Sequence, residues 1–264
     1  MGDKLNVSCV QMNCKPGDIE FNLNKAADFA SEARKTDTQM LVLPELFDIG
    51  YDLASLDTLK INTQKTVDAV SKIARDNNMF IAAGLTENNG EALYNSLYII
   101  NDLGEVVEKY RKINLFSLSK ENHYFKPGTK PQSFIIKGIK IGIMICYDIR
   151  FPELGRNYLK DGCSAILISS AFPKPRQEHW NTLLKARAVE NQLYVIASNR
   201  TGRVDSIEFA GCSSIIDPWG VVSDKLDDEE GIINSTITMD KVDEVRKLIP
   251  CYDDMTRLEG LLRI

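Results

Sequence analysis

The chain has 264 residues, enough for one large domain or two small ones, and its 44% hydrophobic and 26% charged residues are ordinary for a globular protein. Its formal net charge is −5 and its basic residues are scattered, which argues against nucleic acid or an anionic membrane as a partner. Its six cysteines form no C-x-x-C pair, and its two histidines cannot complete a zinc-finger spacing.

The sequence also indicates where the protein works. Its N-terminus lacks the charged and apolar regions of a signal peptide, and no apolar run has the length of a membrane-spanning helix. Four of the six cysteines lie in or beside apolar, strand-like runs, as reduced core thiols do. We therefore predict a cytoplasmic protein that does not bind a membrane.

The first part of the chain alternates strand and helix signals. Apolar residues at every second position predict strands, and apolar residues three or four apart predict helices. In chain order these signals are a strand over Leu5–Met12, a helix over Phe21–Arg34, a short strand over Met40–Leu43, a helix over Thr63–Asp76 and a buried strand over Met79–Leu85.

Strand pairs without a helix between them follow. The predicted pairs are Leu93–Ile100 with Val106–Tyr110, and Gln132–Ile136 with Ile139–Ile145, separated by a long loop over Ile113–Pro131. The remaining predicted elements are a helix over Pro152–Lys160, strand Ala165–Ser169, helix Gln177–Gln192, strands Tyr194–Asn199, Phe209–Ile216, Val221–Ser223 and Ile232–Thr238, helix Lys241–Lys247 and an irregular tail. Two mixed sheets packed face to face, with helices outside, accommodate all these elements in one domain over residues 1–264.

The segment Ile141–Pro152 carries the most functional information. Its apolar run ends at Cys146, polar residues follow at once, and Pro152 then opens a helix. A thiol at a strand-to-helix turn is held by the strand and has backbone N–H groups just ahead of it, which suits a nucleophile. The alternative is that Cys146 is a small buried hydrophobe, as most free cysteines are.

Three other polar residues occur at or near the ends of predicted strands. Glu45 follows Leu41–Pro44, Lys112 follows the strand that ends at Tyr110, and Glu121 lies among aromatic residues in the next loop. Each one alone is usually a solvated strand end or loop residue. Together with Cys146 they supply the thiol, carboxylate and ammonium groups that acyl transfer through a thioester requires.

These segments resemble the nitrilase superfamily of carbon–nitrogen hydrolases, along nearly the whole chain. The segments are L-P-E-L-F around Glu45, Y-R-K-I-N-L-F around Lys112, C-Y-D-I-R-F-P-E-L around Cys146, and the run from Ala171 to Gln192. The resemblance implies a four-layer α-β-β-α sandwich, no metal or organic cofactor, and a homodimer or higher homo-oligomer that pairs through helical faces.

The resemblance also implies a Glu-Lys-Cys triad and its roles. Cys146 would be the nucleophile, Glu45 the general base, and Lys112 the cation that stabilises the thiolate and the tetrahedral intermediate. Glu121 would hold Lys112 and the substrate, and the backbone N–H of Tyr147 would complete the oxyanion site. The family commonly has His at the position of Asn114, and Asn can still donate and accept hydrogen bonds there.

Several residues near these segments could contact the substrate or could be purely structural. Arg150 or Arg176 could bind a substrate carboxylate, and Tyr51 and Phe172 could line the pocket. Asp148, with Arg150 and Glu153, could form a salt-bridge network that fixes the turn.

Other charged and polar residues are predicted to be structural. Arg187 and Glu190 lie three apart on a helix and could pair there. A solvated loop position is predicted for His123, and a capping or core position for His179.

The resemblance favours hydrolysis of a small carboxamide to a carboxylic acid and ammonia through a cysteine thioester. The motifs are most similar to the amidase branch that acts on ω-amides of 2-oxo-dicarboxylates, such as 2-oxoglutaramate. An N-carbamoyl (ureido) amino-acid hydrolase would use the same four residues, and nitrile hydrolysis is a weaker alternative. The alternative outside the enzymes is a non-catalytic interaction protein with this fold. Loss of Glu45, Lys112 or Cys146 would favour it, but all three are present.

Overall fold

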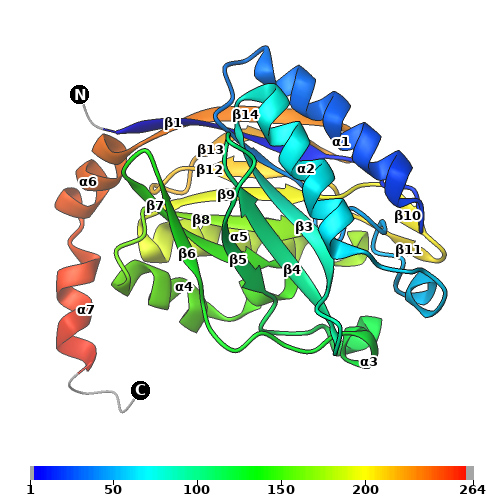
Figure 1. Cartoon of the computed structure of the whole chain (residues 1–264). Coiled ribbons are helices and arrows are strands. Elements are labelled where there is room, and N and C mark those ends of the chain that lie inside the picture. Colours follow the sequence, from blue (N-terminus) through cyan, green and yellow to red (C-terminus); the bar gives the residue numbers. More distant parts are fainter. Residues whose placement is uncertain (1–2, 260–264) are drawn as a thin grey trace.

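Two six-stranded sheets form the centre of the molecule in the computed structural model, which describes residues 3–259 (Figure 1). The first sheet has the order β14-β1-β2-β3-β4-β5, with β1 Lys4–Gln11, β2 Met40–Val42, β3 Phe80–Asn88, β4 Leu93–Ile100, β5 Val106–Arg111 and β14 Gly231–Thr238. The second has the order β13-β12-β9-β8-β7-β6, with β6 Ser133–Ile136, β7 Ile139–Ile145, β8 Ala165–Ser170, β9 Tyr194–Asn199, β12 Ser214–Ile216 and β13 Val222–Lys225.

Both sheets are mixed. In the first sheet β1, β2 and β3 run parallel, whereas β14, β4 and β5 add antiparallel strands at its edges. In the second sheet β7, β8 and β9 run parallel, and β6, β12 and β13 are antiparallel to their neighbours. A small hairpin, β10 Arg203–Val204 with β11 Ile207–Glu208, lies outside both sheets.

Helices cover the outer face of each sheet, which confirms the predicted α-β-β-α sandwich (Figure 1). The longer helices are α1 Ile19–Arg34, α2 Thr63–Asn77, α4 Pro152–Lys160, α5 Gln177–Asn191, α6 Met239–Leu248 and α7 Cys251–Glu259. The short ones are α3 Glu121–Tyr124 and the 3-10 turns η1 Leu53–Asp57, η2 Ser117–Ser119, η3 Cys146–Arg150 and η4 Lys174–Arg176. None of the described helices combines the length and apolarity needed to cross a bilayer.

The alternation of side chains along each strand explains the layering. On β1, Leu5, Val7 and Cys9 belong to the core between the two sheets, whereas Val10 faces the core shared with α1 and α2. Because successive side chains of a strand point to opposite faces, the first sheet buries both. The central strands are therefore apolar almost throughout, as strands buried on both faces are.

Three predicted segments differ from the structure. The predicted loop Ile113–Pro131 contains the short helical elements η2 and α3. The predicted strand Phe209–Ile216 is a strand only over Ser214–Ile216, because Gly211 and Cys212 have φ values of +60° and +56° and turn the chain away from the sheet. The predicted irregular tail is wrong over Cys251–Glu259, which forms α7. The rest of that prediction, residues 260–264, lies outside the described residues.

Candidate active site

Glu45 reaches the space between the sheets because the chain after β2 passes unusually close to β3. A Cβ atom added to Gly84 of β3 would lie 2.5 Å from the Pro44 carbonyl oxygen and 2.7 Å from Glu45 Cα, closer than any side chain allows. From the second sheet, the Ser169 hydroxyl donates a hydrogen bond to the Leu43 carbonyl at 2.8 Å. The Glu45 carboxylate is fully buried at this junction.

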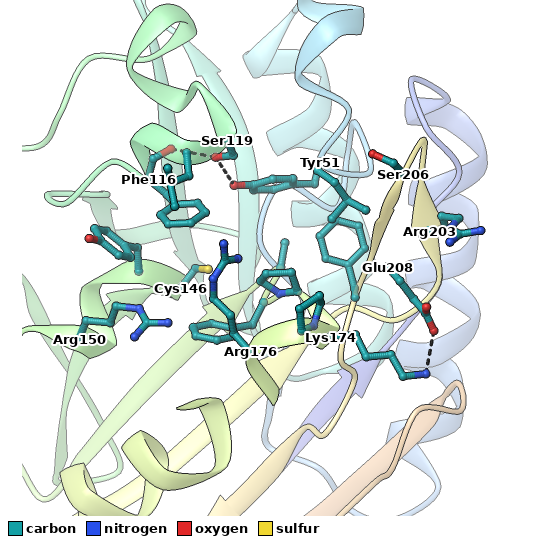
Figure 2. A pocket seen from close by; sticks show the side chains of 18 residues that line it. Tyr51, Phe116, Ser119, Cys146, Arg150, Lys174, Arg176, Arg203, Ser206 and Glu208 are labelled. Carbon is teal, nitrogen blue, oxygen red and sulfur yellow. Dashed lines mark hydrogen bonds and ion pairs between the residues drawn. The ribbon is translucent and has the colours of Figure 1, made fainter. Parts of the chain in front are cut away.

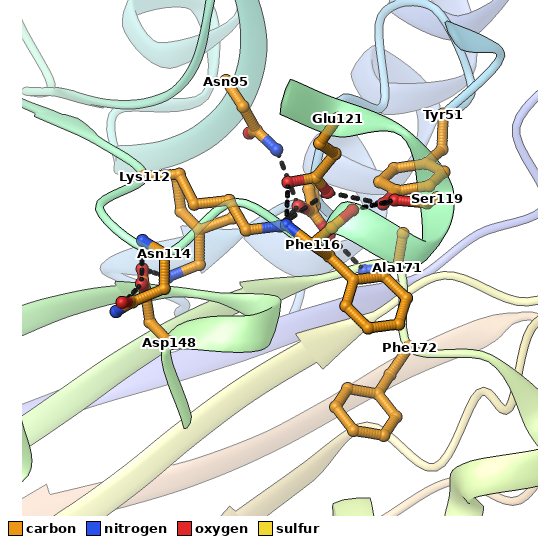
Figure 3. A network of polar contacts seen from close by, with 12 residues as sticks. Tyr51, Asn95, Lys112, Asn114, Phe116, Ser119, Glu121, Asp148, Ala171 and Phe172 are labelled. Carbon is orange, nitrogen blue, oxygen red and sulfur yellow. Dashed lines mark hydrogen bonds and ion pairs between the residues drawn. The ribbon is translucent and has the colours of Figure 1, made fainter. Parts of the chain in front are cut away.

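Lys112 follows β5 and lies between two carboxylates. Its Nζ is 2.7 Å from Glu45 Oε1 and 2.7 Å from Glu121 Oε1, and all three side chains are completely buried. Glu121 is the first residue of α3, and its Oε2 accepts a hydrogen bond from the Phe116 backbone N–H at 2.9 Å. Figure 3 shows Lys112 and Glu121 pointing toward each other from these two segments. Glu45, from an earlier part of the chain, thus joins Lys112 and Glu121 in one buried ion cluster.

Tyr51 lies between this ion cluster and the pocket described below. Its hydroxyl donates to Glu121 Oε1 at 2.5 Å and lies 3.1 Å from the Ser119 hydroxyl. The backbone of Tyr51 has φ +56°, a sparsely populated conformation for a bulky residue. Such strain persists only where the surrounding contacts impose it, and it is common at functional sites.

Cys146 follows the last residue of β7 and begins η3, as the strand-to-helix pattern predicts. Its φ is +44°, so the backbone turns sharply here, as at the nucleophile of a strand–turn–helix elbow. The next residue is Tyr147, and the N–H groups that open a helix have no intrahelical acceptor. The side chains of Cys146 and Tyr147 line the same pocket.

Asp148 fixes this turn through neutral donors rather than through the predicted salt bridges. Its Oδ2 accepts from the Tyr110 hydroxyl at 2.7 Å and from the Ile145 N–H at 3.0 Å. Its Oδ1 accepts from the backbone and side-chain N–H groups of Asn114, at 3.0 and 2.9 Å. Asn114 therefore connects the loop after Lys112 to the Cys146 turn.

Burial and neighbouring charges shift the pKa values of Cys146, Glu45 and Lys112. Burial and then the negative charge of Glu45 raise the pKa of Cys146, although Lys112 opposes this, so the resting residue is a neutral thiol. Burial and the nearby Glu121 raise the pKa of Glu45, against the effect of Lys112. Burial alone would lower the pKa of Lys112, but the carboxylates of Glu121 and Glu45 outweigh it and raise that pKa. The cluster therefore pairs a protonated thiol with a carboxylate of increased basicity and a permanent cation.

A pocket of about 520 Å³ opens onto Cys146. It is lined by all four residues predicted to contact substrate, namely Tyr51, Arg150, Phe172 and Arg176. Figure 2 shows Arg150 and Arg176 on the side of the pocket where Cys146 lies, and Lys174 with Glu208 on the other side. The thiol of Cys146 and the guanidinium groups of Arg150 and Arg176 thus lie on the same side of the pocket.

Sequence reasoning missed part of this wall. The hairpin β10–β11 and Phe209 also line the pocket, and Phe209 packs edge-on against Tyr51 with ring centroids 5.8 Å apart. It also missed Asn95 of β4, whose side-chain amide donates to Glu45 Oε1 at 2.7 Å. A polar Asn in the middle of the apolar run of β4 is the signal that could have identified it.

The structure also places the remaining predicted residues. Arg187 pairs with Glu190 at 2.7 Å, as predicted, and donates to the Ile149 carbonyl behind the Cys146 turn. His123 is exposed, as predicted, but it lies on α3 and not in a loop. The prediction of a capping or core position for His179 is wrong, because His179 is exposed and its Nδ1 lies 3.2 Å from the Arg150 guanidinium. Within residues 3–259, no group of three or more His, Cys, Asp or Glu side chains is placed to hold a metal ion.

Comparison with known proteins gives consistent results. Residues 6–247 match the family described as Carbon-nitrogen hydrolase. The chain is 40% identical to the 2-oxoglutaramate amidase of Bacillus subtilis (strain 168) over 256 residues, 96% of this chain and 98% of that protein.

Solved structures share the fold. A Saccharomyces cerevisiae member of branch 10 of the nitrilase superfamily has a TM-score of 0.85 and 29% identity, covering 94% of this chain and 95% of that one. The amidase from Nesterenkonia sp. AN1 has a TM-score of 0.84 and 25% identity, covering 93% of this chain and 98% of that one. The latter structure shows the result of Michael addition of acrylamide at the active site cysteine.

Proposed function

The chain belongs to the carbon–nitrogen hydrolase family and is a cysteine-dependent amidase of the nitrilase superfamily, and on this basis we propose that it hydrolyses the terminal amide of a small carboxylate. The ω-amides of 2-oxo-dicarboxylates, which include 2-oxoglutaramate, are the substrate class we favour. The relative from Bacillus subtilis is named for that substrate.

In the proposed mechanism Cys146 is the nucleophile and Glu45 the general base. Glu45 takes the thiol proton while the sulfur attacks the amide carbon, and Lys112 and the Tyr147 N–H meet the developing oxyanion. Glu45 then gives its proton to the leaving nitrogen, and ammonia departs from a thioester on Cys146. Glu45 then takes a proton from water, which attacks the thioester carbonyl. The C–S bond breaks, the carboxylic acid leaves, and Glu45 returns the proton to the sulfur of Cys146. Glu121 holds the Lys112 ammonium in place through both acylation and hydrolysis.

The substrate proposal rests on one observation: of the three arginines that line the pocket, Arg150 and Arg176 lie on the side of Cys146 and have no acidic partner in the part of the chain that the structure describes. Arg150 stacks over Phe172 at 5.4 Å, with His179 as its hydrogen-bond partner, and Arg176 stacks over Phe116 at 5.1 Å. Among the described residues, neither has a carboxylate within ion-pair distance. Guanidinium groups that are positioned but unpaired favour a substrate with a carboxylate at the end away from the amide.

Two amides of almost equal shape test this proposal. Succinamate and butyramide differ in having a carboxylate or a methyl group at the end away from the amide. We expect kcat/KM for succinamate to exceed that for butyramide by about 10- to 100-fold, the range of a charge-assisted hydrogen bond. In Arg150→Leu and in Arg176→Leu this preference should shrink through a higher KM for succinamate, while hydrolysis of butyramide is unchanged. Ammonia release measures both rates.

Arg203→Leu is the matched control, because Arg203 also lines the pocket but lies away from Cys146 (Figure 2). The preference for succinamate should survive in this variant. If both amides are hydrolysed equally by the wild type, the carboxylate proposal fails. If an N-carbamoyl amino acid is hydrolysed far faster than either amide, the ureido hydrolase is the better description.

We also propose a homodimer that pairs through α5 and the turn between β12 and β13. Val189 on α5 and Trp219 and Val221 on the turn are 52%, 46% and 53% exposed, and a Cβ on Gly220 would lie 2.5 Å from Val189 Cγ2. Three large apolar side chains so close together favour a protein interface. We expect sedimentation to give twice the mass of one chain, and Trp219→Glu to give the mass of a single chain. A monomeric wild type would contradict the proposal.

We also propose that the protein acts in the cytoplasm, because of its free cysteines. All six cysteines are free thiols, and five of them are buried. A reducing environment keeps such thiols, and a nucleophilic Cys146 above all, in their reduced form.

A further inference from the structure

Asn95 contacts both ends of the buried ion cluster. Its side-chain Nδ2 donates to Glu45 Oε1 at 2.7 Å, and its backbone carbonyl accepts from the Lys112 N–H at 2.9 Å. The residue lies on β4 and is 1% exposed. Figure 3 shows its amide pointing into the cluster. One residue of β4 therefore fixes the carboxylate and the segment that carries the cation.

The hydrogen bonds of Glu45 leave one acceptor direction open. A carboxylate has about four lone-pair positions, two on each oxygen. Oε1 accepts from Lys112 Nζ and from Asn95 Nδ2, each at 2.7 Å, which fills both of its positions. Oε2 accepts from the Ala171 backbone N–H at 2.8 Å, which fills one. The second position on Oε2 is left to receive a proton.

The orientation of the Asn95 amide supports this role. Its Oδ1 is buried and, among the described residues, has no hydrogen-bond partner, an arrangement that is costly in a folded protein. The opposite orientation would set Oδ1 against Glu45 Oε1, with one acceptor facing another. In the observed orientation, therefore, Nδ2 donates to the ionised Glu45 and Oδ1 is left without a hydrogen bond from the described part of the chain.

We propose that Asn95 is a positioning residue that keeps Glu45 ionised, saturates Oε1 and so directs the Cys146 proton to Oε2. The proton moves from Sγ to Oε2, and the electron pair of the S–H bond stays on sulfur. Asn95 touches neither the thiol nor the substrate in this step. The inference rests on the proposed role of Glu45 as general base.

Alkylation of Cys146 by iodoacetamide against pH tests the proposal without any substrate. The rate is followed on the peptide that contains Cys146, so that the exposed Cys251 does not interfere. In Asn95→Leu we expect the rate at the plateau to fall about 10-fold and the acidic limb of the profile to move up by about one pH unit, since a hydrogen bond to a charged group is removed. Asn95→Ala carries the same expectation and serves if the leucine variant does not fold.

Ser96→Ala is the matched control for a purely structural effect. Ser96 is the next residue of β4, is equally buried and donates to Glu87 Oε2 at 2.7 Å, away from Glu45. This variant should lose stability without moving the acidic limb. If the limb stays in place in the Asn95 variants, or moves equally in Ser96→Ala, the inference is wrong.

Glu45→Gln separates this inference from the proposed function. The variant should lose the acidic limb altogether. If its profile equals that of the wild type, Glu45 is not the base and the proposed mechanism fails with it. If the limb disappears in Glu45→Gln but is unmoved in the Asn95 variants, only the role of Asn95 is refuted.

Discussion

Replacing Cys146 with alanine is expected to reduce kcat by at least about 10⁴-fold, because it removes the atom on which the thioester forms. The fold should persist, since the substitution deletes only the sulfur and keeps the Cβ at the strained position with φ +44°. Ammonia release from succinamate gives the rate, and thermal unfolding gives the stability. In the wild type, an acyl adduct should be found by mass spectrometry on the peptide that contains Cys146.

Cys163→Ala is the matched control for the loss of a buried thiol. Cys163 is 0% exposed, lies before β8 at the end of the strand far from the pocket, and belongs to the hydrophobic core that includes residues of α4 and α5. Its replacement should cost about as much stability as that of Cys146 while kcat is retained. Turnover that survives in Cys146→Ala and is lost in Cys163→Ala would refute the nucleophile assignment.

Replacing Lys112 with methionine should have the second largest effect, on activity and on stability together. Activity should fall by about 10³-fold or more, because the oxyanion loses its cation. Stability should fall by about 3–5 kcal/mol, because Glu45 and Glu121 are left buried without a positive charge. Ammonia release and urea denaturation at neutral pH measure the two losses.

The pH dependence of that variant gives a further check of the charge argument. Without the cation, the carboxyl pKa values of the folded variant lie above those of the unfolded chain. The folded state then binds more protons than the unfolded state, so the stability of the variant rises as the pH falls. The gain should be smaller in the wild type, because Lys112 opposes the rise in the pKa of Glu45 that burial causes.

A double variant separates stability from catalysis. Lys112→Met combined with Glu121→Gln removes the cation and one carboxylate, so most of the lost stability should return. Activity should not return, because the oxyanion still has no cation. If activity recovers together with stability, Lys112 acts only as a structural counter-ion.

The strand ends of the site were predictable from the sequence because each has a local signal. Glu45 and Cys146 follow runs of apolar residues, which identify a buried strand and the point where it ends, and Lys112 follows the second strand of a predicted hairpin. The structure brings these three ends to one junction between the sheets. Their proximity itself came from the family resemblance, since the spacing of the residues alone says nothing of it.

The features that were missed depend on contacts between distant segments. Phe209–Ser213 is as apolar as a strand, but Gly211 lies against Asp227, with an added Cβ only 2.5 Å from its carbonyl oxygen, and the chain turns there instead. Asn95 looks like a polar interruption of β4 until Glu45, fifty positions earlier in the sequence, is placed beside it. Neither partner can be inferred from neighbouring residues.

The order of strands in the first sheet has a consequence for the synthesis of the chain. β14 pairs with β1 along its whole length, from Lys4 with Thr238 to Gln11 with Gly231, although the second sheet is encoded between them. While a ribosome is still making the intervening segment, β1 is an open edge strand with unpaired backbone groups. The nascent protein therefore carries an aggregation-prone edge until β14, at Gly231–Thr238 of 264 residues, has been synthesised. Only then does β14 complete the sheet whose strands lead to Glu45 and Lys112.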